Sequence, residues 1–337
     1  MNLTMTDKQL KINDEFFGRW NKQTTLTKPK EFDFEPIKDL EPNPRALEFE
    51  KKNFIEFASA FINSMDFNDE QERGRPRCNL KDVIISLCIM SYNNLSYRRT
   101  MSDLMELKSK EIIKQIPKKT SLHKYMNSKY IRSIIEDLIQ YTSLFFVDSE
   151  NTIICDSTWL ATRMYTGGYK TVYCRKYPLE GSRKLHLSIL KNSKVISCAK
   201  ASEGNAHDSP FFKYLVGTTF KNGFKLSTIL ADSGYQSVES HKFCGVLGIK
   251  NVFIDFRKNV KLTGNKGIVW RKSLRLFREH PKIWKETYRY RVLIESVNSA
   301  IKRKQKNYLR MKNETAQDVE LLLMALVYNF TIVCKYI

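Results

Sequence analysis

The sequence predicts an α/β protein in which a mixed central sheet follows a region built only of helices. Two observations lead to this prediction. Residues 41–147 show apolar side chains at helical spacing and no strand-like segment. From residue 148 onward, short β-branched segments alternate with helical ones in the order β-β-β-α-β-α-β-α. That order is typical of a mixed sheet with helices on its faces.

The helical region is expected to begin after Pro44, where the apolar spacing starts. A polar segment at 65–76 ends the first helix, and the Asn93–Asn94 pair divides the next apolar cluster into two helices. Residues 1–40 are polar, mixed and aperiodic, so we expect a polar N-terminal arm or a loosely docked segment there. The expected helical segments are 45–64, the two halves of 79–108, and 120–146.

The remainder of the chain, residues 148–337, is expected to form a second domain. The polar turn "KNSK" joins two of its strands in a hairpin. A long basic segment at 257–287 precedes a helix over 288–304 and a terminal helix. The expected strands are 151–158, 184–190, 194–202, 225–234 and 250–256, and the expected helices between them are 208–220 and 237–248.

The chain carries a formal net charge of +21, from 57 Lys and Arg against 36 Asp and Glu. So large a surplus repels itself in the folded state unless a polyanion is the usual partner. Nucleic acid is the first candidate, because neutralising its phosphates releases counterions. A membrane surface is the alternative, but the cations are spread along the chain rather than gathered beside one amphipathic anchor. We therefore expect a nucleic-acid partner and no membrane.

The seven cysteines form no CxxC pair and show no zinc-like spacing with a histidine. They are expected to be small core residues in a reducing compartment, the cytoplasm. No signal peptide is apparent at the start of the sequence. The longest apolar run, 319–333, is broken by Asn329 and Thr331 and is too short to span a bilayer, so we expect a buried terminal helix.

Asp156 and Asp232 follow the apolar runs of the first and fourth expected strands. If these strands are parallel neighbours, both carboxylates emerge at the same edge of the sheet, where open α/β sheets place their sites. A divalent cation would offset the desolvation of carboxylates placed there. Each Asp taken alone also suits a turn or a helix cap, so that interpretation stays open.

The helix over 288–304 places Tyr288, Arg291, Glu295 and Lys302 within a sector of roughly 60°. Its apolar side chains gather on the opposite side, where they can pack on the sheet. Arg291 and Lys302 suit phosphate oxygens, and Tyr288 suits a phosphate or the face of a base. Glu295 suits a metal ion, or it is only the i,i+4 partner of Arg291 on a solvated helix face.

This spacing, Y-x2-R-x3-E-x6-K, closely resembles the signature of prokaryotic insertion-sequence transposases with a DDE, RNase H-like core. Further segments are similar to the same family and stand in the same order. They are "GRPRCNLKDVIISL" for the N-terminal helical region, "IICDSTWLATR" for the first Asp, "GNAHDSPFF" for a loop and helix entry, "ILADSGYQS" for the second Asp, and "LVYNF" for the closing helix. The resemblance covers residues 70–335.

The resemblance implies a fold, a metal and a set of catalytic residues. Residues 148–337 would be an RNase H-like DDE catalytic domain, and residues 41–147 a helical DNA-binding domain. Asp156, Asp232 and Glu295 would be the catalytic residues and would bind two divalent ions, normally Mg²⁺, for which Mn²⁺ can substitute.

The resemblance also implies partners and an activity. Tyr288, Arg291 and Lys302 would bind DNA phosphates near a transposon end. The partners would be double-stranded DNA, both transposon ends and target, and a second copy of the chain, because synapsis joins two ends. The activity would be metal-dependent cleavage at terminal inverted repeats and strand transfer. A non-catalytic DNA-binding regulator and a metal-dependent nuclease without strand transfer are the alternatives.

Two other features leave choices open. His207 and Asp208 precede a helix, and Asp208 is expected to be its N-cap rather than half of an acid–base pair. The basic stretch from Arg257 to Lys285 carries interleaved aromatic residues, which suit either a DNA channel or a solvated loop with a few core aromatics. These aromatic residues are Trp270, Phe277 and Trp284.

Overall fold

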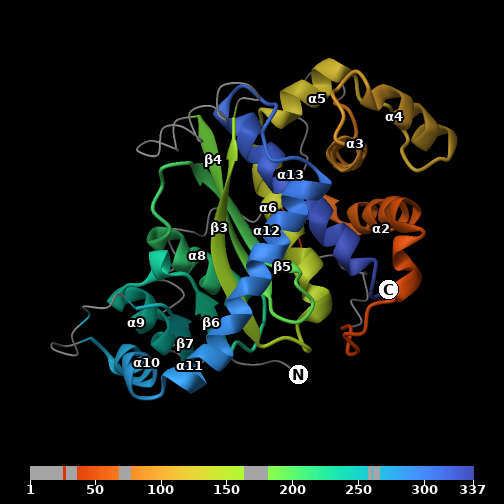
Figure 1. Cartoon of the computed structure of the whole chain (residues 1–337). Helices are drawn as coiled ribbons and strands as arrows, with labels where there is room; N and C mark the ends of the chain where they lie inside the picture. Colours follow the sequence, from red (N-terminus) through yellow and green to blue (C-terminus); the bar gives the residue numbers. More distant parts are fainter. Residues whose placement is uncertain (1–25, 28–35, 68–76, 163–180, 257–259, 261–265) are drawn as a thin grey trace.

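The computed structural model describes residues 26–27, 36–67, 77–162, 181–256, 260 and 266–337. The strands of its main sheet are β3 (Thr152–Ala161), β4 (Ser182–Leu190), β5 (Ile196–Glu203), β6 (Thr228–Ala231) and β7 (Asn251–Ile254). They lie in the order β5-β4-β3-β6-β7 (Figure 1). β4 is antiparallel to both of its neighbours, whereas β3, β6 and β7 run parallel. The predicted mixed sheet and its five strands are confirmed.

Helices fill most of the described chain before β3, as the spacing predicts. They are η1 (Pro44–Leu47), α2 (Glu50–Ser64), α3 (Leu80–Tyr92), α4 (Thr100–Ser109), α5 (Lys119–Met126), α6 (Lys129–Ser143) and η2 (Leu144–Phe146). The segment predicted at 120–146 divides in two because Ser128 begins a new helix, its side chain accepting a hydrogen bond from the N–H of Ile131. The two-residue strands β1 (Leu26–Thr27) and β2 (Asp66–Phe67) pair beside these helices, so this region is not wholly helical.

Part of the predicted N-terminal arm is docked on the fold. The N–H of Ile37 donates to the carbonyl of Phe145 at 2.7 Å, and the N–H of Asn43 donates to the carbonyl of Lys335 at 2.7 Å. These bonds tie the segment beginning at residue 36 to the end of the helical region and to the end of the chain. Most of the arm lies outside the described residues, and the division into domains at 147 and 148 stays a prediction.

The helices that follow β5 also appear in the predicted order. They are α8 (Ser209–Lys221), η3 (Ser233–Tyr235), α9 (Val238–Val246), α10 (Ile268–Glu279), α11 (Pro281–Tyr288), η4 (Arg289–Arg291), α12 (Val292–Lys304) and α13 (Glu314–Val333). The basic stretch, for which a DNA channel and a solvated loop were both left open, contains α10 and α11, although 257–259 and 261–265 lie outside the described residues. The single helix predicted over 288–304 is wrong in one respect, because a 3-10 turn separates α11 from α12.

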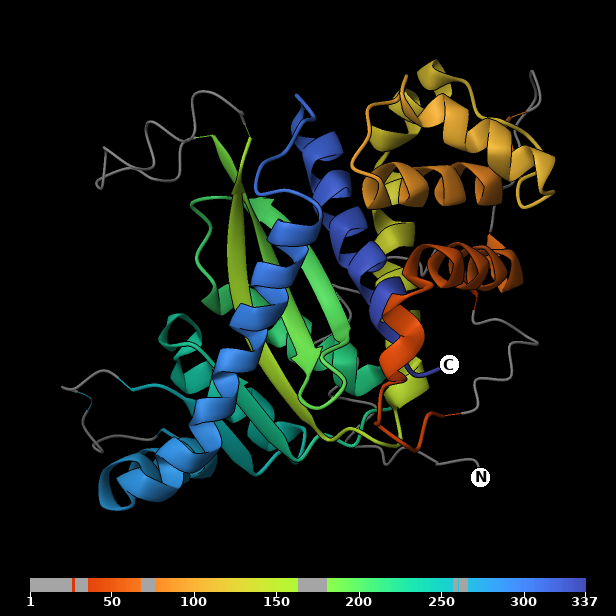
Figure 2. The same ribbon diagram turned by 45° about the vertical axis from the view of Figure 1, so that its right-hand side comes forward.

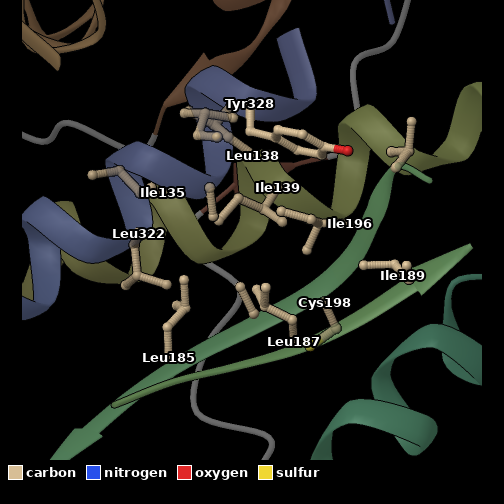
Figure 3. Close-up of a cluster of buried hydrophobic side chains, with 14 of the residues drawn as sticks. Ile135, Leu138, Ile139, Leu185, Leu187, Ile189, Ile196, Cys198, Leu322 and Tyr328 are labelled. Atoms are coloured by element: carbon tan, nitrogen blue, oxygen red, sulfur yellow. The ribbon is translucent and has the colours of Figure 1, made fainter. Parts of the chain in front are cut away.

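One face of the sheet carries the main apolar core. Figure 3 shows Leu185 and Leu187 of β4 facing Ile139 of α6 and Leu322 of α13, and all four side chains are buried. α13 is long and apolar enough to cross a membrane, but 94% of its most apolar stretch is buried inside the protein. The predicted buried terminal helix is confirmed, and α13 is the central helix of this core.

The alternate side chains of β4 face α8 on the other side of the sheet, as the two-residue period of a strand requires. The ring of His186 stacks on Phe211 of α8 with centroids 3.8 Å apart. The hydroxyl of Ser188 lies 3.3 Å from that of Thr219, also on α8. The sheet is therefore covered on both faces, and on the α8 side the hydroxyls of Ser188 and Thr219 lie within hydrogen-bonding distance.

A buried ionic network joins both halves of the chain around Asp318 of α13. Arg183 of β4 donates to Asp318 from Nε at 2.9 Å and from Nη2 at 2.6 Å. Arg132 of α6 donates to the second oxygen of the same carboxylate at 2.6 Å. Two guanidinium groups thus neutralise one buried carboxylate and fix α6, β4 and α13 against one another.

α12 crosses β3 obliquely in both Figure 1 and Figure 2, and the two elements are in contact. The pairing of β3 with β6 ends at Cys155, whereas β3 continues to Ala161, so this later part of β3 has no strand neighbour on that side among the described residues. The chain that leaves α12 returns to this edge, where Leu309 N–H donates to the carbonyl of Ala161 at 2.7 Å. α12 is therefore held beside the part of β3 that begins at Asp156.

Candidate active site

Asp156 and Asp232 lie side by side at the same level of two parallel strands. Cys155 of β3 is in register with Ala231 of β6, and each Asp is the next residue along its strand. Asp232 follows the last residue of β6, as predicted, whereas Asp156 lies within β3 rather than at its end. The two carboxylates still share one edge, because β6 stops there.

The pKa of Asp156 is raised to about 6, chiefly because the carboxyl is buried. The N–H of Ser157 and the cation of Arg291 act in the opposite direction, while the negative charges of Asp232 and Asp208 raise the pKa further. Three carboxylates therefore crowd one partly buried place. A bound cation would relieve both their mutual repulsion and their desolvation.

Arg291 connects this pair of strands to α12. Its Nη1 atom lies 3.5 Å from Oδ2 of Asp156, and its Nη2 atom forms an ion pair with Glu295 one helical turn away. Glu295 is 52% exposed, so its carboxylate is accessible from solvent. Of the two interpretations of Glu295, the i,i+4 pairing with Arg291 is observed, and the metal-binding role stays a prediction.

Tyr288 lies beside the end of β6 rather than on an open surface. Its hydroxyl donates to the carbonyl of Ala231 at 3.4 Å, and its ring stacks on Trp284 with centroids 6.1 Å apart. Burial raises the pKa of the Tyr288 hydroxyl. Tyr288 therefore helps to hold the backbone that carries Asp232.

Lys302 is the member of the predicted set that lies farthest from the two Asp residues along α12. Its Nζ atom sits 5.5 Å from the ring centroid of Trp159 on β3. The structure therefore brings Tyr288, Arg291 and Glu295 to the Asp156 neighbourhood and places Lys302 at the other end of the same helix.

The donor set of this neighbourhood suits a hard divalent cation. All of its acidic ligands are carboxylate oxygens, which Mg²⁺ and Mn²⁺ prefer. Within the described residues, no group of three or more His, Cys, Asp or Glu side chains is already arranged as a metal site. Asp156 and Asp232 are the neighbouring carboxylates that could hold a cation, whereas Glu295 pairs with Arg291, so its place in a metal site stays a prediction.

Asp208 is a further acidic residue of this neighbourhood, and it stands at the predicted N-cap position of α8. It occupies the position before α8, but its side chain makes no capping hydrogen bond. Its Oδ1 atom instead lies 3.2 Å from Nζ of Lys184 and 3.4 Å from Nδ1 of His186. Its Oδ2 atom approaches the backbone of Gly234, where an added Cβ atom would be only 3.0 Å away. Asp208 therefore supports the turn that follows Asp232.

The sequence does contain a sign of this arrangement, but in residues distant from Asp208. Lys184 and His186 are two residues apart on β4, so both side chains lie on the same face of the sheet, the one covered by α8, and Asp208 stands at the start of α8. Burial lowers the pKa of His186 to about 4, so its ring is neutral at physiological pH. Lys184 is then the cation that balances Asp208.

The aromatic residues of the basic stretch belong to the core. Trp270 and Trp284 are buried, and both contact Phe256, with centroids 5.7 Å and 5.9 Å from its ring. Phe277 packs on the same ring at 5.6 Å. Of the two interpretations left open for this stretch, the core interpretation is confirmed for these residues.

The cysteines agree with their predicted role. The six described cysteines carry free thiols, and five of them are buried. Burial raises the pKa of Cys198 to about 12 and that of Cys334 to about 12. These thiols are therefore protonated at neutral pH and suit neither metal binding nor nucleophilic attack. Cys174 lies outside the described residues.

Comparison with known proteins gives one match. Residues 144–330, more than half of the chain, match the family model described as the transposase DDE domain. The matched range contains Asp156, Asp232 and Glu295 and ends within α13. No curated protein and no solved structure matches the chain.

Proposed function

The chain belongs to the family of transposases with a DDE domain, and from that premise we propose that it cleaves DNA at the terminal inverted repeats of a transposable element and joins the ends to target DNA. Transposases of this family bind DNA and generally use a divalent metal. We also propose that the chain is of the class with the Tyr-Arg-Glu-Lys signature, represented by Tyr288, Arg291, Glu295 and Lys302.

One observation carries the proposal. Asp156 and Asp232 stand at equivalent positions of the parallel strands β3 and β6, and Arg291 connects Asp156 to Glu295 on α12. Three carboxylates from distant parts of the sequence are thus linked at one edge of the sheet. A solvated helix face would not account for the contact between Arg291 and a half-buried Asp of the sheet.

We propose that Asp156, Asp232 and Glu295 hold two divalent ions, normally Mg²⁺ with Mn²⁺ as a substitute. When bound, such ions activate water or a 3′-hydroxyl as the nucleophile and stabilise the leaving oxygen in an in-line displacement at phosphorus. Arg291 contributes a planar guanidinium suited to the oxygens of the reacting phosphate. Tyr288 holds the carbonyl of Ala231, which precedes Asp232.

The proposed DNA contacts follow from charge and position. The net charge of +21 favours a polyanionic partner, and Lys302 extends the cationic side of α12 away from Asp156. We propose that the helices before β3 contribute to DNA binding and that two copies of the chain join two element ends. The proposed fold of the catalytic part is RNase H-like, which the antiparallel strands β3 to β5 followed by parallel β6 and β7 support.

Cleavage of DNA that carries the flanking inverted repeats tests the proposal. With Mg²⁺, the wild-type protein should nick the repeat ends and yield joined products with a target plasmid. Asp232→Ala should bind the same DNA without cleaving it, and Glu203→Gln, a change of an exposed carboxylate on β5, should cleave normally. Binding without cleavage by the wild-type protein would indicate a regulator, and cleavage without joining would indicate a nuclease.

A further inference from the structure

The helices α10 and α11, which we call the basic lobe, concentrate positive charge outside the candidate active site. Together they carry six Lys and Arg and two Glu. This excess is larger in proportion than that of the whole chain, which has 57 Lys and Arg against 36 Asp and Glu. So local a surplus repels itself unless an anionic partner lies on it. None of the six cations belongs to the candidate active site.

The basic lobe packs on the protein through one side and leaves its cations on the other. Trp270 of α10 and Trp284 of α11 are buried. At about 100° per residue, Arg271, Arg275 and Arg278 fall within a sector of roughly 60° on the exposed side of α10. The sequence of α10 therefore separates a side that packs on the core from a side that carries guanidinium groups.

Three cations of the basic lobe have no anionic partner within the described chain. Arg275, Lys282 and Lys285 are exposed, and none of them forms an ion pair with another residue that the structure describes. Lys213 of α8 differs from them, because it pairs with Glu239 at 3.2 Å. Three charges on one lobe are thus available to the phosphates of a polyanion.

α12 connects the basic lobe to the helices before β3. At the C-terminal end of α12, the carbonyl of Gln305 accepts a hydrogen bond from Nδ2 of Asn94 at 2.7 Å. At its N-terminal end, the 3-10 turn η4 joins it to α11. Figure 1 and Figure 2 both show the basic lobe and the helices α3 to α5 at opposite ends of α12. Arg291, which contacts Asp156, lies between them.

The exposed side chains of the basic lobe suit paired rather than unpaired nucleic acid. Trp270 and Trp284 are buried against Phe256, so neither offers a ring to an unpaired base. The exposed residues are mostly cations, which contact phosphates and carry no sequence information. Contacts of this kind suit a duplex whose sequence differs from one site to another.

We propose that the basic lobe binds the phosphate backbone of duplex DNA beyond the reacting phosphodiester, on the side away from the element end. Under the proposed function, Lys302 and the helices before β3 hold the element end, so DNA that continues past Arg291 reaches α11. That DNA is the flanking duplex before cleavage or the target duplex during joining, and both present the same backbone. This inference rests on the proposed function for the position of the reacting phosphate.

The length of α11 sets how much DNA is needed. Arg291 and Lys282 are nine residues apart, or about 14 Å at 1.5 Å per residue. A duplex rises about 3.4 Å per base pair, so the basic lobe begins about four base pairs beyond the reacting phosphate. A flank of about 10 base pairs, one turn of the duplex, is therefore long enough to reach it.

Binding in EDTA tests the proposal without metal and without catalysis. Anisotropy compares the full-length protein on a repeat-end duplex with a flank of about 10 base pairs and on the same end without a flank. The wild-type protein should bind the flanked duplex more tightly. The triple variant Arg275→Gln, Lys282→Gln, Lys285→Gln should lose that difference, and its slope of log K against log salt concentration on the flanked duplex should fall by about 2.7 for three phosphate contacts. Its affinity for the unflanked end should equal that of the wild-type protein, which also shows that the variant is folded.

A second triple variant removes the same charge from the opposite edge of the sheet. Lys194, Lys225 and Lys250 are exposed and precede β5, β6 and β7, at the edge away from Asp232. The variant Lys194→Gln, Lys225→Gln, Lys250→Gln should keep the preference for the flanked duplex. Equal slopes for the two triple variants on the flanked duplex would overturn the proposal, because the loss would then follow net charge and not position.

A joining assay distinguishes flanking from target DNA as the ligand. With Mg²⁺ and an end that is already cut, the first triple variant should join the end to a plasmid more slowly than the wild-type protein if the basic lobe holds target DNA. If it holds only flanking DNA, joining should be normal and only the preference for the flanked duplex should be lost. Wild-type behaviour of the variant in both assays would overturn the proposal.

The outcomes separate this inference from the proposed function. A wild-type protein that cleaves repeat-end DNA but shows no preference for the flanked duplex, and whose first triple variant joins normally, contradicts only the role of the basic lobe. A protein that prefers the flanked duplex through these three cations but never cleaves contradicts only the assignment as an active transposase.

Discussion

Arg291 lies within ion-pairing distance of Asp156, with Nη1 of the guanidinium 3.5 Å from Oδ2 of the carboxylate. This contact joins the segment before α12 to the middle of β3, across 135 residues of sequence. The spacing of Tyr288, Arg291, Glu295 and Lys302 assigns Arg291 to DNA, whereas the fold pairs it with two carboxylates. The proposed role of Arg291 in DNA binding therefore requires that it exchange a carboxylate partner for a phosphate.

Replacing Arg291 with Ala should weaken binding to repeat-end DNA and reduce its dependence on salt. One phosphate contact fewer lowers the slope of log K against log salt concentration by about 0.9. Lys302→Ala should reduce the slope by a similar amount. Filter binding or anisotropy over a series of salt concentrations measures the slopes.

Lys213 provides the matched control for that series, because this lysine of α8 pairs with Glu239 and lies outside the proposed DNA contacts. Lys213→Ala should keep the slope of the wild-type protein. An unchanged slope for Arg291→Ala would mean that Arg291 stays with Asp156 and Glu295 when DNA is bound.

Asp156→Asn should stabilise the folded protein at pH 8. The pKa of Asp156 is raised from 3.8 to about 6, so ionisation is less favourable in the folded chain than in the unfolded one. The destabilisation is absent below the unfolded pKa, grows as pH rises from about 4 to 6, and is complete above the folded pKa. For this carboxyl, 17% exposed, it amounts to about 1–3 kcal/mol once the loss of its contact with Arg291 is included.

Urea denaturation at pH 8 and pH 5 measures the effect. The gain of Asp156→Asn should be larger at pH 8, because at pH 5 much of the wild-type carboxyl is already protonated. Glu203→Gln should show no gain at either pH, since its carboxylate is exposed. A gain that is equal at the two pH values would show that the charge of Asp156 is not its cause.

Divalent metal should raise the melting temperature of the wild-type protein without DNA. A ligand that binds only the folded state at 100 times its Kd stabilises it by about 2.7 kcal/mol. The shift with Mg²⁺ or Mn²⁺ should exceed that with NaCl at equal ionic strength, and it should be lost in Asp156→Asn and Asp232→Asn. Equal shifts in the wild-type protein and both variants would place the ion elsewhere.

The sequence predicts the order of the strands and helices because each element has its own apolar period. It also places Asp156 and Asp232 at one edge, since both follow buried apolar residues in strands that turn out to be parallel neighbours. It does not predict that a 3-10 turn interrupts 288–304, because that turn depends on Tyr288 packing against Trp284 and bonding to β6. The spacing of residues within one segment does not reveal contacts with other segments.

The roles that the sequence left open or gave only in part were those decided by residues distant in the sequence. Asp208 has the local features of an N-cap, but its carboxylate contacts Lys184 and His186 of β4 instead of capping the helix. Trp270 and Trp284 have the local features of a DNA channel, but both lie in the core around Phe256. The deciding partners of Asp208 lie on β4, and the deciding partner of the two tryptophans is Phe256, just after β7.

Asp208→Asn should move the acidic limb of the pH profile of DNA cleavage to lower pH. The charge of Asp208 raises the pKa of Asp156, so its removal lowers that pKa and keeps Asp156 ionised in more acidic solution. Lys184, freed from Asp208, acts in the same direction. Single-turnover cleavage rates across the acidic range measure the shift.

Asn205→Ala is the matched control, because it changes an exposed residue of the same loop that carries no titratable group. Its pH profile should keep the acidic limb of the wild-type protein. If Asp208→Asn lowers the rate equally at every pH, Asp208 only supports the turn at Gly234 and does not tune Asp156.

Asn329 interrupts the apolar run of α13, and the fold shows why an amide stands there. Its Oδ1 atom accepts from the N–H of Ile196 at 2.8 Å, and its Nδ2 atom donates to the carbonyl of Ile196 and to Oγ1 of Thr142, each at 2.8 Å. One fully buried side chain thus satisfies the backbone of β5 and joins it to α6.

Asn329→Leu should therefore lower the free energy of unfolding by about 2–4 kcal/mol, although it makes α13 more apolar, because both backbone groups of Ile196 lose their partner inside the core. Thr331→Val is the matched control, since among the described residues the buried Thr331 hydroxyl bonds only to the carbonyl of Tyr328, within its own helix, at 2.8 Å. Loss of the Thr331 hydroxyl should change the free energy of unfolding little. Urea denaturation of the two variants compares the effects, and equal stabilities would mean that the amide contributes no more than a helix-internal hydroxyl.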